Sequence, residues 1–86
     1  MSEQPETRLD LRGLKCPLPA LKTRAALAGL RPGDVLLVEC TDPLAGLDIP
    51  HLLRETADIL EAQERQGTAI VFRIRKGQVT PSETAG

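Results

Sequence analysis

The fold of this chain follows from the stretch at residues 14–28, LKCPLPALKTRAALA. Its second half is rich in good helix formers with apolar residues at helical spacing, which predicts a helix that begins at or near Pro17. Proline is tolerated in the first turn because the N–H groups there have no intrahelical partner. Pro17 and Pro19 therefore cost the helix little, and Cys16 lies at its start. The apolar residues at helical spacing are Leu18, Leu21, Ala25 and Ala28.

Cys16 is where we expect the chemistry of this protein. The amides of Leu18 and Ala20 are free donors of the first turn and can point towards the Cys16 sulfur. A thiolate at a helix N-terminus can have its pKa lowered from about 8.5 to roughly 3.5–7.5, and Lys15 and Arg12 can add positive charge nearby. The alternative is a small buried apolar residue beside prolines that punctuate a loop. Its position between a strand and a helix, with polar flanks, favours a reactive thiol.

The segments on either side of the first helix predict a strand, a turn and a second strand. Residues 7–12 alternate polar and apolar side chains, which is typical of a strand packed on one face. Gly13 then turns the chain into the helix, and its lack of a side chain would also leave open the approach to the sulfur. The helix is expected to end near Ala28, with Gly29 as a left-handed C-cap. After a turn, the apolar run at residues 35–40 predicts a central strand parallel to the first.

Two aspartates precede prolines or apolar runs in the next segment. Asp42 and Asp48 are interpreted as helix caps, with Asp48 opening a second helix at about residues 49–57, and a role in partner recognition is the alternative. His51 is expected to be exposed and without a role. It could act as a base for Cys16, but the sequence offers no partner to orient it.

The last third of the chain contains one ambiguous segment and one clear strand. Residues 57–65 are good helix formers that could extend the second helix, although Gln66 and Gly67 form a plausible hairpin turn. Residues 68–75 are rich in β-formers, with alternate apolar side chains on one face, and predict a strand.

Five segments of the sequence resemble the TusA/SirA family of sulfur carriers. Residues 9–19, LDLRGLKCPLP, resemble the opening Cys-Pro-x-Pro signature of that family. The other four segments occur in the same order and at similar separations as in the family: residues 30–34 (LRPGD), 41–45 (TDPLA), 48–50 (DIP) and 74–76 (IRK). The resemblance covers roughly residues 8–77, and five segments in register make it specific.

The resemblance implies a fold and an activity. The fold is α/β, a two-layer α+β sandwich of order βαβαββ, with a four-stranded mixed sheet, two helices on one face and a third strand at about residues 58–65. The activity is that of a sulfurtransferase without a cofactor, in which Cys16 carries sulfur stoichiometrically as a persulfide. Gly13, Pro17 and Pro19 belong to the motif that positions this cysteine.

The resemblance also implies partners. A cysteine desulfurase or a rhodanese-like protein would supply the sulfur, and a DsrE-like or other acceptor protein would receive it. The pathways served in the family are thiolation of the tRNA wobble uridine, molybdenum-cofactor-related metabolism and sulfur oxidation. The positive residues that flank Cys16 are candidates for a docking surface, unless they simply form a solvated face; they are Arg12, Lys15, Lys22 and Arg24.

Length and composition limit the other possibilities. The 86 residues allow one domain at residues 7–77, with flexible tails at 1–6 and 78–86. The net charge of −1 and a single aromatic residue predict no direct binding to nucleic acid. No secretory signal or membrane-spanning run is visible, so a cytoplasmic protein is expected.

The cysteine pattern leaves one rival to the carrier. In the cytoplasm Cys16 and Cys40 are expected to be free thiols, and with a single histidine and no Cys-x-x-Cys spacing they make no metal site. Cys40 is interpreted as a packed small residue. The rival is a thiol-redox switch in which Cys40 resolves Cys16 as a disulfide. A third function, a nucleic-acid-binding regulator, rests only on the likeness of the family's fold to a domain of a translation initiation factor.

Overall fold

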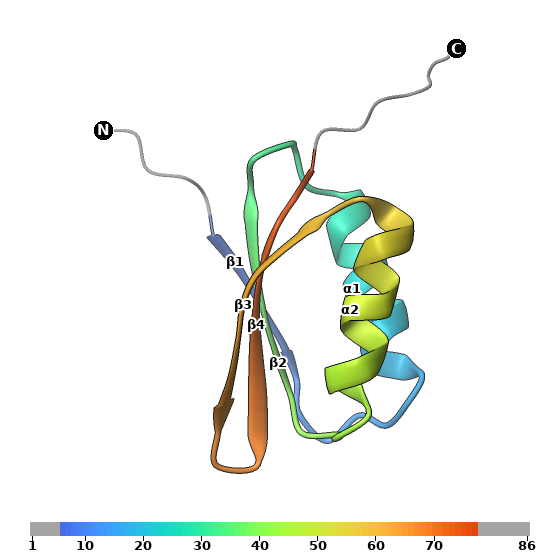
Figure 1. Cartoon of the computed structure of the whole chain (residues 1–86), viewed down its shortest axis with the longest axis vertical. Helices are drawn as coiled ribbons and strands as arrows, with labels where there is room; N and C mark the ends of the chain where they lie inside the picture. The colour runs from blue at the N-terminus through green and yellow to red at the C-terminus, as the bar shows by residue number, and fades with distance from the viewer. Residues whose placement is uncertain (1–5, 78–86) are drawn as a thin grey trace.

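The computed structural model describes residues 6–77 and contains a four-stranded sheet and two helices. The elements in chain order are β1 (Glu6–Leu11), α1 (Leu18–Ala28), β2 (Val35–Cys40), α2 (Ala45–Thr56), β3 (Ile59–Gln66) and β4 (Ala69–Arg75). The strand order is β1-β2-β4-β3, in which β1 and β2 are parallel and the other pairs antiparallel. Both helices lie on the same face of the sheet (Figure 1). The predicted βαβαββ sandwich with a mixed sheet is confirmed.

The core lies between the central strands and the helices. Leu36 and Val38 of β2 are fully buried, as is Phe72, which pairs with Val38 from β4. From the other layer, Ile49 and Leu53 of α2 pack into the same cluster. Each such side chain contributes about 1.5–3 kcal/mol when it leaves water. A chain with a single aromatic residue can therefore still build a core from aliphatic side chains.

The first strand begins one residue earlier than the sequence predicts. Glu6, expected in the flexible tail, lies in β1 and pairs with Val35 of β2. Its carboxylate accepts a hydrogen bond from the Arg73 guanidinium of β4 at 2.8 Å. This pairing across the open face of the sheet explains why the strand extends to residue 6. The rest of the two predicted tails, residues 1–5 and 78–86, lies outside the described residues.

The buried face of α1 does not include the leucines at helical spacing. Pro19, Thr23 and Leu27 face the core, whereas Leu18 and Leu21 are 43% and 54% exposed. Apolar residues are spread around this helix, so their spacing alone did not identify the face that packs. The consequence is an exposed pair of leucines beside Cys16.

The ends of both helices also correct the sequence analysis. Gly29, the expected left-handed cap, has φ −93° and is not left-handed. The second helix begins at Ala45, not near residue 49, so Asp48 lies within its first turn and does not cap it. The left-handed residue is Ala57, at φ 64°, which ends α2.

The segment after Ala57 is a strand, as the resemblance implied. The helix propensity of its residues favoured an extension of α2 instead. The chain pairs with β4 through Gln66, then reverses at Gly67, where φ is 62°. Asp58, before β3, is buried and accepts a hydrogen bond from the Gly77 amide at 2.8 Å. A Cβ atom at Gly77 would lie 2.2 Å from the Ala57 carbonyl oxygen, so only glycine fits this contact.

Candidate functional site

Two loops meet at one edge of the sheet. Because β1 and β2 are parallel and Leu11 pairs with Cys40, the loops that follow both strands leave from the same edge (Figure 1). The Gly13 amide donates a hydrogen bond to the Thr41 hydroxyl at 2.8 Å. Gly13 has φ +87°, which makes it the turn predicted from the sequence and explains the choice of glycine. The contact joins the loop that carries Cys16 to the loop that precedes α2.

Asp42 holds the backbone of Cys16. One oxygen of its carboxylate accepts a hydrogen bond from the Cys16 amide at 2.6 Å, and the other accepts one from the Leu44 amide at 3.0 Å. These two bonds lower the pKa of Asp42. Asp42 is not the N-cap residue of α2, which is Leu44, but its bond to the Leu44 amide caps the short turn that precedes this helix, as the sequence indicated. Asp42 also fastens the cysteine loop to the turn before α2.

Asp48 contacts the sulfur itself. The Cys16 thiol donates a hydrogen bond to the Asp48 carboxylate, with 3.0 Å between Sγ and Oδ2. This bond is the main reason why the pKa of Cys16 is raised, followed by partial desolvation and the charges of Asp48 and Asp42. The prediction of a lowered pKa is therefore wrong for the free protein. A carboxylate from another element reaches the sulfur, which the sequence did not reveal.

The helix amides do not replace that contact. The Leu18 amide, expected to point at the sulfur, donates to the Lys15 carbonyl at 2.8 Å. Pro17 is the N-cap residue of α1, and its carbonyl accepts the first helical hydrogen bond, from Leu21. Pro19 is buried against the core. The two prolines thus lie at the helix start, each one position earlier than the sequence analysis placed it, and Cys16 is exposed.

A groove of about 270 Å³ lies beside Cys16, between α1 and α2. Leu21 and Arg24 of α1 line one side, and Asp48, His51 and Glu55 of α2 line the other. His51 is exposed, as predicted, and its Nε2 lies 3.6 Å from the Glu55 carboxylate. Sequence reasoning gave His51 no role and missed this partner, four residues further along the helix.

The four predicted docking cations are not all at the groove. Arg24 lines it together with Cys16. The Arg12 guanidinium pairs with Asp10 at 2.9 Å and holds the pKa of that carboxyl at about 2. Lys15 contributes to the lowered pKa of Asp42. The remaining residue of the four, Lys22, is exposed on α1.

The second cysteine has a different environment. Cys40, the last residue of β2, has no exposed surface and belongs to the hydrophobic core. Burial raises the pKa of its thiol to about 11. Both cysteines are free thiols in this structure. Their surroundings therefore fit one reactive thiol at the surface and one packed small residue.

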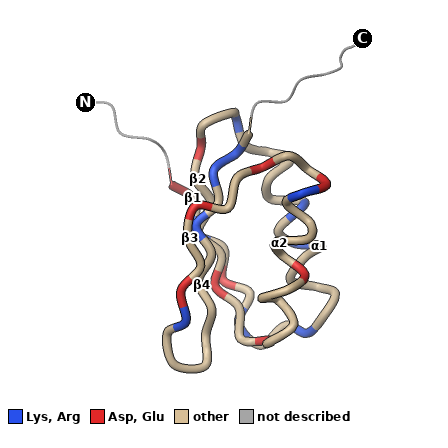
Figure 2. The backbone as a smooth tube through the Cα atoms, viewed as in Figure 1, with Lys and Arg blue, Asp and Glu red and all other residues tan. Residues whose placement is uncertain are grey.

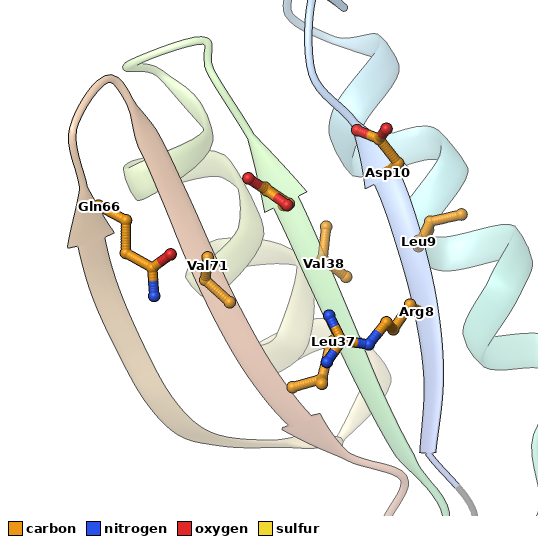
Figure 3. A pocket seen from close by; sticks show the side chains of 8 residues that line it. Arg8, Leu9, Asp10, Leu37, Val38, Gln66 and Val71 are labelled. Carbon is orange, nitrogen blue, oxygen red and sulfur yellow. The ribbon is translucent and has the colours of Figure 1, made fainter.

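Other surfaces of the described residues differ from the groove beside Cys16. A shallow hollow of about 300 Å³ crosses the sheet face that the helices leave open, with Arg8 and Asp10 of β1 and Leu37 of β2 among its side chains (Figure 3). Charges of both signs are interspersed along residues 6–77 (Figure 2). Within those residues no cluster of three or more histidine, cysteine or acidic side chains could hold a metal ion. Neither of the two described helices is long and apolar enough to cross a membrane.

The fold and the exposed cysteine define a class, namely small α/β domains that present a motif thiol at the edge of the sheet. The family model described as sulfurtransferase TusA matches residues 7–76, and the chain belongs to this family. Two proteins of Neisseria meningitidis, from serogroups A and B and each named as a candidate sulfur carrier, are 47% identical over 60 residues, which is 69% of this chain and 81% of theirs.

The fold has a counterpart among solved structures. The crystal structure of a SirA-like protein from Desulfitobacterium hafniense has a TM-score of 0.73 with this chain at 23% identity. The match covers 84% of this chain and 99% of the other. This likeness supports the fold.

Proposed function

We propose that this protein is a sulfur carrier that accepts sulfane sulfur as a persulfide on Cys16 and passes it to an acceptor protein. The observation that carries the proposal is the contrast between the two thiols, since Cys16 is exposed at the edge of a groove and Cys40 is buried in the core. Family membership and relatives named as candidate sulfur carriers support it. A carrier needs an accessible nucleophile and a docking surface, and it needs no enclosed substrate site.

The transfer step is redox-neutral. The Cys16 thiol first loses its proton, because the thiolate is the nucleophile. The thiolate attacks the outer sulfur of a persulfide on the donor protein, so that a new S–S bond forms at Cys16. The S–S bond of the donor breaks, and its cysteine sulfur leaves with the electron pair and takes up a proton. The products are a Cys16 persulfide and a donor thiol, and delivery to the acceptor repeats the same exchange.

The docking surface of the carrier is the groove beside Cys16. Leu18 and Leu21 expose apolar surface on α1, and Arg24 adds a cation to the same side. Exposed apolar side chains around a reactive group are typical of interaction sites. Lys15 and Lys22 are exposed and are proposed as further contacts for a partner, whereas Arg12 is engaged by Asp10. The donor is a cysteine desulfurase or a rhodanese-like protein, and the acceptor a DsrE-like or other protein of tRNA thiolation, cofactor synthesis or sulfur oxidation.

The test is the intact mass of the protein after incubation with a cysteine desulfurase and cysteine. The wild type and Cys40→Ser should gain about 32 Da, the mass of one sulfur atom, and lose it with a reductant, while Cys16→Ser should gain nothing. Repeating the incubation with a rhodanese and thiosulfate tests the second donor class. No gain with either donor would overturn the proposal, and so would an equal gain in Cys16→Ser.

The rival function, a redox switch, requires Cys40 to meet Cys16 as a thiolate. The burial of Cys40 and its pKa of about 11 oppose this reaction. In the same mass measurement a switch would lose two hydrogens, and it would need both cysteines.

A further inference from the structure

The hydrogen bond between Cys16 and Asp48 has a consequence for how the thiol is activated. Asp48 belongs to α2, so its distance of 3.0 Å from Sγ depends on how this helix packs beside the cysteine loop. A carboxylate accepts a hydrogen bond from a thiol but repels a thiolate, since both then carry negative charge. The contact therefore stabilises the form of Cys16 that does not react.

Within residues 6–77, the charges that act on the sulfur are those of Asp48 and Asp42, and both are negative. Asp42, which binds the Cys16 amide, contributes a second negative charge, and both aspartates raise the pKa of the thiol. The other charged groups around the sulfur and its groove are Lys15 on the cysteine loop, Arg24 on α1, and His51 and Glu55 on α2. Lys15 acts on Asp42, and His51 pairs with Glu55. The sulfur itself thus contacts one carboxylate, that of Asp48, and the charge of a second, Asp42, acts on it from beside the Cys16 amide.

We propose that Asp48 keeps Cys16 as a protonated thiol in the free protein, and that a sulfur donor activates Cys16 by placing a lysine or arginine side chain against the Asp48 carboxylate. The proposal rests on the proposed carrier function and specifies the partner of the same site. An ammonium or guanidinium group at Asp48 would neutralise its charge and compete for the hydrogen bond. Cys16 would then release its proton only where a suitable partner is docked.

We call this control of Cys16 by Asp48 the gate. It gives a physical reason why a sulfur carrier would have a thiol with a raised pKa. A free thiolate reacts with any oxidant or electrophile that it meets, whereas a thiol is nearly inert. Asp48 is only partly exposed, and it lines the groove beside exposed Leu21. A donor seated on this surface would bring its cation to the carboxylate and exclude water, which strengthens the pairing.

The first test is the pH dependence of Cys16 alkylation by iodoacetamide in the free protein. Asp48→Asn retains the shape of the side chain but removes its charge, so the midpoint should move to lower pH. Each pH unit of that shift raises the alkylation rate below the midpoint about tenfold. Glu55→Gln is the matched control, because Glu55 lines the same groove without a hydrogen bond to the sulfur, and its midpoint should stay close to that of the wild type.

The second test uses two methanethiosulfonates, one carrying a trimethylammonium group and the other a sulfonate. The Cys16 thiolate attacks the divalent sulfur of either reagent, a disulfide forms, and methanesulfinate leaves with the electron pair. The wild type should prefer the cationic reagent more strongly than the neutral thiol N-acetylcysteine amide does. In Asp48→Asn the preference for the cationic reagent should fall several-fold, and in Glu55→Gln it should fall less.

These measurements separate the gate from the carrier function. A midpoint unchanged or raised in Asp48→Asn would overturn the gate, as would an unchanged preference between the two reagents. If Asp48→Asn fails to fold, the wild type alone still tests the proposal. If its preference for the cationic over the anionic reagent is no greater than that of N-acetylcysteine amide, the sulfur does not lie beside a negative charge and the proposal is refuted. Persulfide loading of the wild type plays no part in either test, so its failure would overturn the carrier function and the activation by a sulfur donor, and would leave the effect of Asp48 on the Cys16 thiol standing.

Discussion

The burial of Cys40 leads to a quantitative prediction about which thiol reacts. With a pKa of about 11, the fraction of Cys40 present as thiolate at pH 8 is about one in a thousand. Its side chain has no exposed surface, so even this small fraction is not open to a reagent in solution. In the native protein Cys40 should therefore react at least about a thousandfold more slowly than a fully ionised, accessible thiol.

The assay follows iodoacetamide labelling at about pH 8 by intact mass, with peptide mapping to locate the label. The native wild type should take up one label, on Cys16, and native Cys16→Ser should remain unlabelled over the same time. In guanidinium chloride both proteins should label at Cys40, because unfolding exposes the thiol and returns its pKa to about 8.5. The unfolded sample is thus the internal control for reagent and time.

Labelling of Cys40 in native Cys16→Ser at a rate within about tenfold of its rate in guanidinium chloride would refute this prediction. It would mean that the end of β2 opens readily, and the redox switch would regain its second thiol. A mass loss of two hydrogens in the oxidised wild type would point the same way. Slow labelling, by contrast, would leave Cys16 as the accessible thiol that the carrier requires.

Two further predictions concern the loop and the helix around the site. Thr23 is fully buried on α1 and its hydroxyl has no hydrogen-bond partner. Thr23→Val should therefore raise the free energy of unfolding by about 1 kcal/mol and the midpoint of thermal unfolding by about 4–8 °C; a loss of stability would show that the hydroxyl is bonded. Asp42 has a lowered pKa through its bonds to the Cys16 and Leu44 amides, so its contribution to stability is complete above the unfolded pKa and disappears as pH falls through the folded one. In urea unfolding, Asp42→Asn should be less stable than the wild type at about pH 7 and equal to it near pH 2, whereas a constant difference would contradict the assignment.

Local patterns predicted most of the elements. The run at residues 35–40 became the central strand, and β4 buries Ile70, Phe72 and Ile74 on one face as its alternation indicated. These patterns succeed because burial on one face of a strand repeats every second residue. For β3 the local signal pointed to a helix, and only its position between a left-handed Ala57 and a glycine turn lets it pair as a strand.

The sequence by itself determined most of the strand and helix segments and the turn at Gly13, because each depends on neighbours in the chain, and its resemblance to the family singled out Cys16. The tertiary structure decided the chemical state of that cysteine. Asp42 and Asp48 are 26 and 32 residues away in sequence, and they reach its amide and its sulfur because parallel strands deliver both loops to one edge of the sheet. The residues around Cys16 predicted a helix N-terminus, which would favour a thiolate. The fold adds the Asp48 carboxylate at hydrogen-bonding distance from the sulfur and the charge of Asp42 beside the Cys16 amide, and both raise the pKa of the thiol.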